Sequence, residues 1–160
     1  MARKQKTTCV GAYDAALSYL TPKARTVREV ELKLDEGNYS EGEIMLAIER
    51  LTDAGLLDDE KYARDFVSSR LDTKPVSRFR LREQLKGHHV PDEIIEAALG
   101  EVEDGTELCN AVEVARKYLR QFRGLEDETE RLRRVYTRLQ TRGYAHDTIM
   151  QALREAADGQ

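Results

Sequence analysis

Apolar residues recur along the chain in three segments that align without gaps, with Leu34, Leu85 and Leu139 as the common anchor. The spacing between anchors is 51 and then 54 residues. Agreement at six positions in three copies indicates an internal repeat. Relative to the anchors, the shared apolar residues are Val30, Leu81 and Val135 four before; Tyr39, Val90 and Tyr144 five after; Ile44, Ile95 and Ile149 ten after; and Ala47 with Ile48, Ala98 with Leu99, and Ala152 with Leu153 thirteen and fourteen after.

The spacing of these residues predicts a pair of helices in each copy. Steps of four residues, as from Val30 to Leu34, place apolar side chains on one face of a helix. Thr26 and Ser40 are each followed three residues later by Glu, which is the pattern of a capping box at a helix start. Pro91 suits a helix start in the second copy. Glycines at 37 and 143 suit the turn that ends the preceding helix.

A third helix is expected before each pair, which makes each repeat a three-helix module. Its apolar stripe is Ala16, Leu17 and Leu20 in copy one, Tyr62, Ala63, Phe66 and Val67 in copy two, and Ala115, Leu119 and Phe122 in copy three. Since such a module buries little apolar surface alone, we expect the modules to stack. The predicted fold is all-α, with three tandem three-helix repeats forming an elongated, curved array of about nine helices; one compact bundle is the alternative. The expected boundaries are 1–10 for a disordered basic tail, then 11–57, 58–104 and 105–157 for the repeats.

One position breaks the repeat. Seven residues before the anchor, Val27 and Leu132 are apolar in copies one and three, but copy two has Arg78. Either Phe79 replaces the missing apolar contact or this surface is exposed for a partner.

Composition excludes several classes of protein. No apolar run approaches the length of a membrane span, and the basic N-terminus has no apolar core of a secretory signal. Cys9 and Cys109 lie a hundred residues apart, which favours a reduced, cytoplasmic setting. The sequence contains no ligand-spaced His or Cys group, phosphate-binding loop, nucleophile motif or catalytic carboxylate pair. We therefore expect no metal, no cofactor and no enzymatic activity; Asp58 and Asp59, which precede the second-copy helix, are interpreted as helix caps.

Positive charge is concentrated in two blocks, although the net charge is −4. Residues 61–90 hold eight basic and three acidic side chains, and residues 114–143 hold nine and four. Acidic stretches surround both blocks, an arrangement that suggests an oriented partner more than general binding to polyanions. The alternative to partner binding is that these basic residues form solvated helix faces, with the aliphatic parts of their side chains covering apolar neighbours. The candidate partner-binding residues are Arg70, Lys74, Arg78, Arg80, Arg82 and Lys86 in the second copy, and Arg116, Lys117, Arg120, Arg123, Arg131, Arg134 and Arg138 in the third, where Arg142 continues the spacing.

The stretch from Leu56 to Arg70, which reads LLDDEKYARDFVSSR, resembles the central signature of the RecX family. That signature has a leucine, a hydrophobic residue, two acids, an aromatic-Ala pair, an aromatic-Val pair and an Arg. The triple repeat, with a turn such as Leu139 to Tyr144, is similar as well, and the resemblance extends over about residues 12–157. The family pattern has a Gly after Arg70, where this chain reads Lys74, Pro75, Val76 and Ser77.

The resemblance implies a regulator of RecA recombinase. RecX proteins bind the helical groove of the RecA filament on single-stranded DNA, limit its extension, and restrain its ATPase, strand-exchange and co-protease activities. The resemblance thus implies a role in DNA repair, recombination and the SOS response. We expect a monomer with at most weak, non-specific binding to single- or double-stranded DNA and no membrane contact. A helix-turn-helix-like DNA-binding regulator and a helical-repeat adaptor protein are the alternatives.

Overall fold

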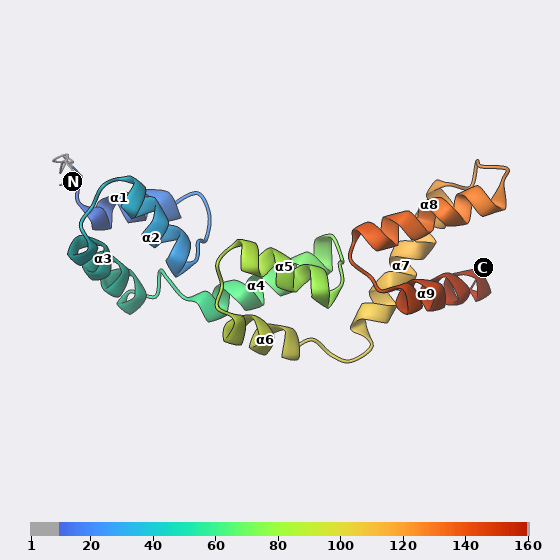
Figure 1. Cartoon of the computed structure of the whole chain (residues 1–160). Helices are drawn as coiled ribbons and strands as arrows, with labels where there is room; N and C mark the ends of the chain where they lie inside the picture. Colours follow the sequence, from blue (N-terminus) through green and yellow to red (C-terminus); the bar gives the residue numbers. More distant parts are fainter. Residues whose placement is uncertain (1–9, 160) are drawn as a thin grey trace. The chain divides into compact units, whose positions relative to one another are not determined.

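The computed structural model describes residues 10–159, and this range holds nine α-helices and no strand. Most of the predicted tail, residues 1–9, lies outside it. No helix within the described range is long and apolar enough to cross a membrane. Figure 1 shows the helices: α1 (Ala12–Leu20), α2 (Val27–Glu36), α3 (Glu41–Asp53), α4 (Asp59–Thr73), α5 (Arg78–Gly87), α6 (Asp92–Gly100), α7 (Thr106–Gln121), α8 (Glu128–Thr141) and α9 (His146–Asp158). The predicted all-α fold of three tandem three-helix repeats is confirmed.

The turn between the second and third helix has the same backbone form in every repeat. Four residues after each anchor the backbone is left-handed, at Asn38 (φ 62°), His89 (φ 61°) and Gly143 (φ 85°). The next N–H then donates to the anchor carbonyl, which closes the helix end. These bonds run from Tyr39 to Leu34 (3.3 Å), Val90 to Leu85 (3.2 Å) and Tyr144 to Leu139 (3.4 Å). The turn role predicted for Gly143 is confirmed, whereas Gly37 has φ −75° and leaves the left-handed position to Asn38.

The predicted helix starts are present. Thr26 and Ser40 form complete capping boxes with Glu29 and Glu43. Asp58 accepts from the N–H of Lys61 at 2.9 Å and so caps α4. Local hydrogen bonding between side chain and backbone, readable from three-residue spacing, therefore decides where these helices begin.

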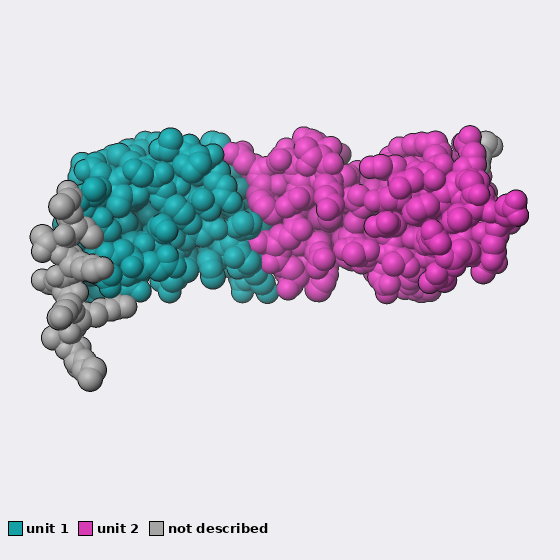
Figure 2. All heavy atoms as spheres, turned by 90° about the horizontal axis from the view of Figure 1, so that it is seen from above, with its two compact units in different colours: residues 1–64, 85–95 teal, residues 65–84, 96–160 magenta. Residues whose placement is uncertain are grey.

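The chain divides into two compact units, coloured separately in Figure 2. The first takes in the chain up to Arg64 together with Leu85–Ile95, and the second takes in Asp65–Gln84 together with the chain from Glu96 onward. All three anchors are buried. One core cluster of the first unit holds Ala12, Ala16, Val30, Leu34, Ala47, Leu51 and Leu57, and one of the second holds Ala111, Val112, Val114, Ala115, Val135, Leu139, Tyr144, Ile149, Ala152 and Ala156.

The position that breaks the repeat is not a core position in the third copy, because Leu132 is 39% exposed. The proposed compensation by Phe79 is wrong, since that ring is 59% exposed. Arg78 instead donates from Nη2 to the carbonyl oxygen of Val102 at 2.8 Å and lies 3.8 Å from a carboxylate oxygen of Asp104. The guanidinium of Arg78 therefore has both a hydrogen-bond acceptor and a carboxylate partner in its own chain.

The start of α2 and the start of α5 make equivalent contacts, each inside its own unit. In the first unit, the Thr26 hydroxyl donates to the His88 carbonyl (2.7 Å) and the N–H of Val27 donates to Asp59 (2.9 Å). In the second unit, the N–H of Ser77 donates to the Arg142 carbonyl (3.0 Å) and the N–H of Arg78 donates to Glu107 (3.1 Å). In both places, unpaired donors at a helix start are satisfied by the following module.

Candidate functional site

Twelve of the thirteen candidate cations lie in the second unit, and Lys86 alone belongs to the first. Within the second unit they do not form one surface. Some surround a hollow without acids, and others are neutralised by neighbouring carboxylates.

A hollow of about 230 Å³ in the second unit brings together candidates from both basic blocks. Arg70 comes from the last turn of α4, Lys74 from the position directly after that helix, Arg80 from α5, and Arg138 from α8. Arg142, one turn after Arg138, joins them. The complete lining is Arg70, Lys74, Val76, Arg80, Gln84, Tyr118, Arg138, Thr141 and Arg142, and these nine described residues include no Asp or Glu.

The segment between α4 and α5 positions two sides of this hollow. Ser77 is buried; its N–H bonds to the Arg142 carbonyl, and its Oγ accepts from the N–H of Arg80 at 3.0 Å. In return, Nη1 of Arg142 donates to the Pro75 carbonyl at 2.7 Å. These bonds bring the end of α8 to the start of α5, and buried Val76 lies in the lining between them.

Tyr118 of α7 adds a polar group to the lining. Nη2 of Arg142 lies 3.4 Å from its hydroxyl oxygen, and this hydrogen bond lowers the pKa of Tyr118. The guanidinium of Arg138 and the ammonium of Lys117 lie 5.7 and 5.8 Å from the centre of the ring. Such distances allow cation–π attraction, which holds positive charge around the ring without neutralising it.

The five cations of the hollow differ in their electrostatic surroundings from the candidates that have carboxylate partners; among the described residues, Lys117, Arg120 and Arg123 likewise form no ion pair but do not line this hollow. None of Arg70, Lys74, Arg80, Arg138 and Arg142 forms an ion pair with another residue in the 10–159 range. Five like charges around one hollow repel each other, and a bound anion relieves that repulsion.

The remaining second-copy candidates are paired. Arg82 makes two hydrogen bonds to Glu96, at 2.5 and 3.1 Å, and these raise the pKa of its guanidinium. Lys86 lies 4.0 Å from a carboxylate oxygen of Asp92. Together with Arg78, these side chains have carboxylates within the chain as partners.

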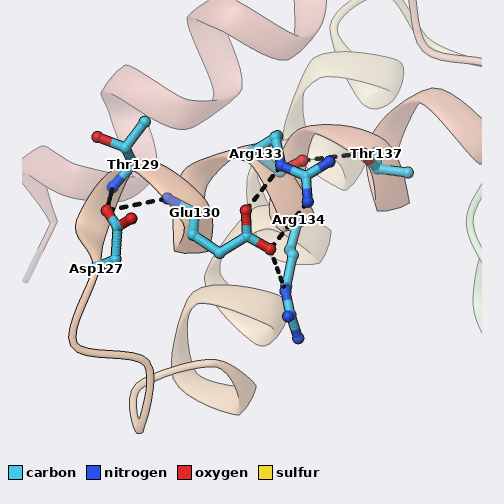
Figure 3. Close-up of polar contacts among 6 residues, drawn as sticks. All are labelled: Asp127, Thr129, Glu130, Arg133, Arg134 and Thr137. Atoms are coloured by element: carbon cyan, nitrogen blue, oxygen red, sulfur yellow. Dashed lines mark hydrogen bonds and ion pairs between the residues drawn. The ribbon is translucent and has the colours of Figure 1, made fainter.

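Several third-copy candidates are also paired, mostly along their own helix. Arg116 contacts Glu113 at 2.7 Å, and Arg131 lies 3.9 Å from Glu128. Figure 3 shows Glu130, in the first turn of α8 after the Asp127 cap, between Arg133 and Arg134, each donating to it at 2.8 Å. The hydrogen bonds from Arg133 and then Arg134 lower the pKa of Glu130 to about 2. Arg120 and Arg123 line a separate hollow with Arg116, Ala156 and Gly159.

The basic spacing along α8 therefore identified Arg138, and extending it one turn finds Arg142. Tyr118 and Ser77 were not identified, because their roles depend on contacts to residues 24 and 65 positions away in the chain. A Ser at the position aligned with Thr26, eight residues before the anchor, is the sequence signal that could have indicated Ser77.

Models of all three RecX three-helix domains match the chain, the first over residues 12–51, the second over 58–99 and the third over 106–153. The regulatory protein RecX of Prosthecochloris aestuarii is 35% identical over 144 residues, which cover 90% of this chain and 92% of that protein. The regulatory protein RecX of Mycolicibacterium smegmatis is 32% identical over 145 residues, covering 86% and 77%. The crystal structure of RecX from Lactobacillus salivarius superposes with a TM-score of 0.77 at 27% identity and covers 91% of this chain and 94% of that one.

Proposed function

Because the chain belongs to the RecX family of regulatory proteins, we propose that it regulates RecA recombinase, mainly as an inhibitor. In this proposal it binds the groove of the RecA filament on single-stranded DNA. It thereby limits filament extension and the ATPase, strand-exchange and co-protease activities. It acts as a cytoplasmic, non-enzymatic monomer in DNA repair, recombination and the SOS response.

The observation that carries the proposal is the match of all three modules, in order, to the RecX domains. The cation-lined hollow supports it, because a partner that contains DNA presents phosphates. We retain the thirteen candidate cations as the proposed contact surface. Arg70, Lys74, Arg80 and Arg138 have first place among them, since those four line one hollow without acids and need not break an ion pair to meet a partner.

The test is the DNA-dependent ATPase and strand exchange of RecA with the full chain added at equimolar and higher ratios. We expect both activities to fall as the chain is added. Unchanged ATPase and strand exchange at these ratios would overturn the proposal.

Two other outcomes would reassign the function. A footprint on one duplex site that persists at raised salt would indicate a sequence-specific DNA-binding regulator. Capture of one partner other than a recombinase, with no retention on RecA–DNA filaments, would indicate an adaptor protein. Weak, sequence-independent DNA binding that falls steeply with salt agrees with the RecA proposal.

A further inference from the structure

We infer that the hollow lined by Arg70, Lys74, Arg80, Arg138 and Arg142 is a phosphate-binding subsite that holds the backbone of single-stranded DNA. The choice of single-stranded DNA rests on the proposed function, whereas the phosphate chemistry rests on the hollow itself. The paired cations, among them Arg82, Arg116, Arg131 and Arg134, lie outside this subsite.

The first support is the excess of uncompensated positive charge. The hollow contains four guanidiniums and one ammonium and no carboxylate. On the same helices, Arg82 and Arg134 have carboxylate partners, so the second unit does contain acids that neutralise its cations elsewhere. The charge of this hollow therefore suits an anion that comes from outside the chain.

The second support is that part of the hollow is held in place before a ligand arrives. Arg142 is fixed by Pro75 and Tyr118, and the start of α5 is fixed by buried Ser77. Arg70 is half-buried, with its guanidinium 5.3 Å from the centre of the Phe66 ring. Preorganised donors lose less conformational entropy on binding than long side chains that move freely.

The third support concerns the shape of the anion. The donors belong to three separate segments of the chain, at the end of α4, in α5 and at the end of α8. A phosphate has oxygens arranged tetrahedrally and can accept bonds from several directions, whereas the two oxygens of a carboxylate lie in one plane with its carbon. Guanidiniums also bind phosphate oxygens in pairs. The arrangement therefore favours phosphate over an acidic peptide.

The fourth support is access. Lys74, Arg80, Arg138 and Thr141 are exposed, so the hollow opens to solvent on the side where these residues lie. A continuous strand can pass over such an opening and place a phosphate in it.

The test uses the full chain without RecA and a fluorescein-labelled oligothymidylate, with binding followed by fluorescence anisotropy over a range of NaCl concentrations. The test variant combines Arg80→Gln and Arg138→Gln. Its matched control combines Arg133→Gln and Arg154→Gln, which removes the same charge from the second unit outside the hollow.

We expect the test variant to raise Kd about tenfold at low salt, the size of effect typical for loss of hydrogen bonds to a charged group. The slope of log Kd against log salt should decrease by about 0.7 for each phosphate that the variant no longer neutralises. The control should stay within about twofold of the unmodified chain, because well-separated surface charges act weakly through salt. Circular dichroism checks that both variants are folded.

The inference would be overturned by a folded test variant that binds like the unmodified chain, by a glutamate-rich peptide that competes as well as unlabelled oligothymidylate at equal charge, or by inorganic phosphate that competes at equal phosphate concentration. A duplex that competes better than the single strand would also overturn it. Because RecA is absent, these results leave the proposed function standing. Conversely, failure of the RecA assay with intact oligothymidylate binding would remove the proposed function and leave the phosphate subsite.

Discussion

The hydroxyl of Thr26 donates a hydrogen bond to the carbonyl oxygen of His88, 2.7 Å away and 62 positions later in the chain. The same hydroxyl oxygen accepts from the N–H of Glu29 at 3.2 Å, so one buried side chain caps α2 and connects it to the next module. In the second unit, Ser77 occupies the aligned position, where its backbone N–H donates to the Arg142 carbonyl at 3.0 Å and its hydroxyl oxygen accepts from the N–H of Arg80 at 3.0 Å. A helix cap thus also serves as a junction in each unit.

Replacing Thr26 with Val, which keeps the shape and removes the hydroxyl, should lower the free energy of unfolding by about 2 kcal/mol. The variant loses a helix cap and both part-buried hydrogen bonds of the hydroxyl, to the N–H of Glu29 and the carbonyl of His88. Denaturation by urea, followed by circular dichroism, measures the loss. Thr26→Ser should restore most of it, and Thr52→Val on the exposed side of α3 should have little effect. Equal stability of Thr26→Val and the unmodified chain would show that the junction contributes nothing.

The carboxylate of Glu29 makes the stability of the first unit depend on acid pH. Burial raises its pKa, but hydrogen bonds from His88 (Nδ1–Oε1 2.9 Å) and from the N–H of Thr26 outweigh this and leave the pKa below its ordinary value of 4.5. Between the folded and unfolded pKa values the unfolded chain binds more protons, so this stabilisation is present above pH 4.5 and is lost as the pH falls through the folded pKa.

Glu29→Gln should therefore flatten the loss of stability below about pH 4.5, by up to about 1.4 kcal/mol per pH unit for one proton. Gln can still accept from the N–H of Thr26, so the capping pattern is kept while the charge is removed. Urea unfolding at a series of pH values gives the slope. If the free energy of unfolding of Glu29→Gln fell with decreasing pH as steeply as that of the unmodified chain, the role of this carboxylate would be contradicted.

Gly143 is the one left-handed position of the three turns that has no room for a side chain. A Cβ there would lie 2.5 Å from Oγ of Ser77 and 3.0 Å from Cβ of Arg80, in addition to the cost of φ 85°. Gly143→Ala should lower the free energy of unfolding by about 2 kcal/mol or more. Gly42→Ala in α3, where a Cβ meets nothing within 4 Å, should instead raise it by about 0.5–1 kcal/mol. Chemical denaturation of both variants tests the pair, and a harmless Gly143→Ala would be the contrary result.

The helices and their cores could be predicted because they depend on local spacing. Leu34, Leu85 and Leu139 are buried as the gapless alignment predicts, and the Thr26 and Ser40 caps require only a Glu three residues on. The junctions could not be predicted, because the bond from Ser77 to Arg142 joins residues 65 positions apart. The partner of Ser77 depends on how the modules stack, and the repeat pattern alone does not determine that stacking.

The basic residues divide in the same way. Pairs such as Arg134 with Glu130 lie four residues apart on one helix, so their neutralisation was readable from the sequence. Arg82 with Glu96 joins two helices, and its pairing needed the structure. Only the three-dimensional arrangement separates the hollow from the rest of the basic surface.

Tyr39 and Tyr144 occupy the same repeat position, yet their hydroxyls have opposite surroundings. Tyr39 donates to the carbonyl oxygen of Val10 at 2.8 Å, whereas the hydroxyl of Tyr144 is buried with no hydrogen-bond partner among the described residues. Burial raises the pKa of Tyr144 to about 12. The second copy has Val90 here, so the position does not require a hydroxyl.

Tyr144→Phe should consequently raise the free energy of unfolding by about 1 kcal/mol, because an unpaired buried hydroxyl is costly, while Tyr39→Phe should lower it slightly.

The dependence of the free energy of unfolding on pH in the alkaline range gives a second readout. Since the folded pKa of Tyr144 (about 12) lies above the unfolded value of 10.0, its neutral form stabilises the fold fully below pH 10, and this contribution is lost as the pH rises toward 12. Tyr144→Phe removes that loss, and Tyr39→Phe should retain it. Urea unfolding between neutral pH and pH 11 separates the two variants. Suppose that Tyr144→Phe lowered the free energy of unfolding and left its decline at alkaline pH unchanged. The hydroxyl of Tyr144 would then have to be hydrogen-bonded in solution, and the contrast between the two copies would not hold.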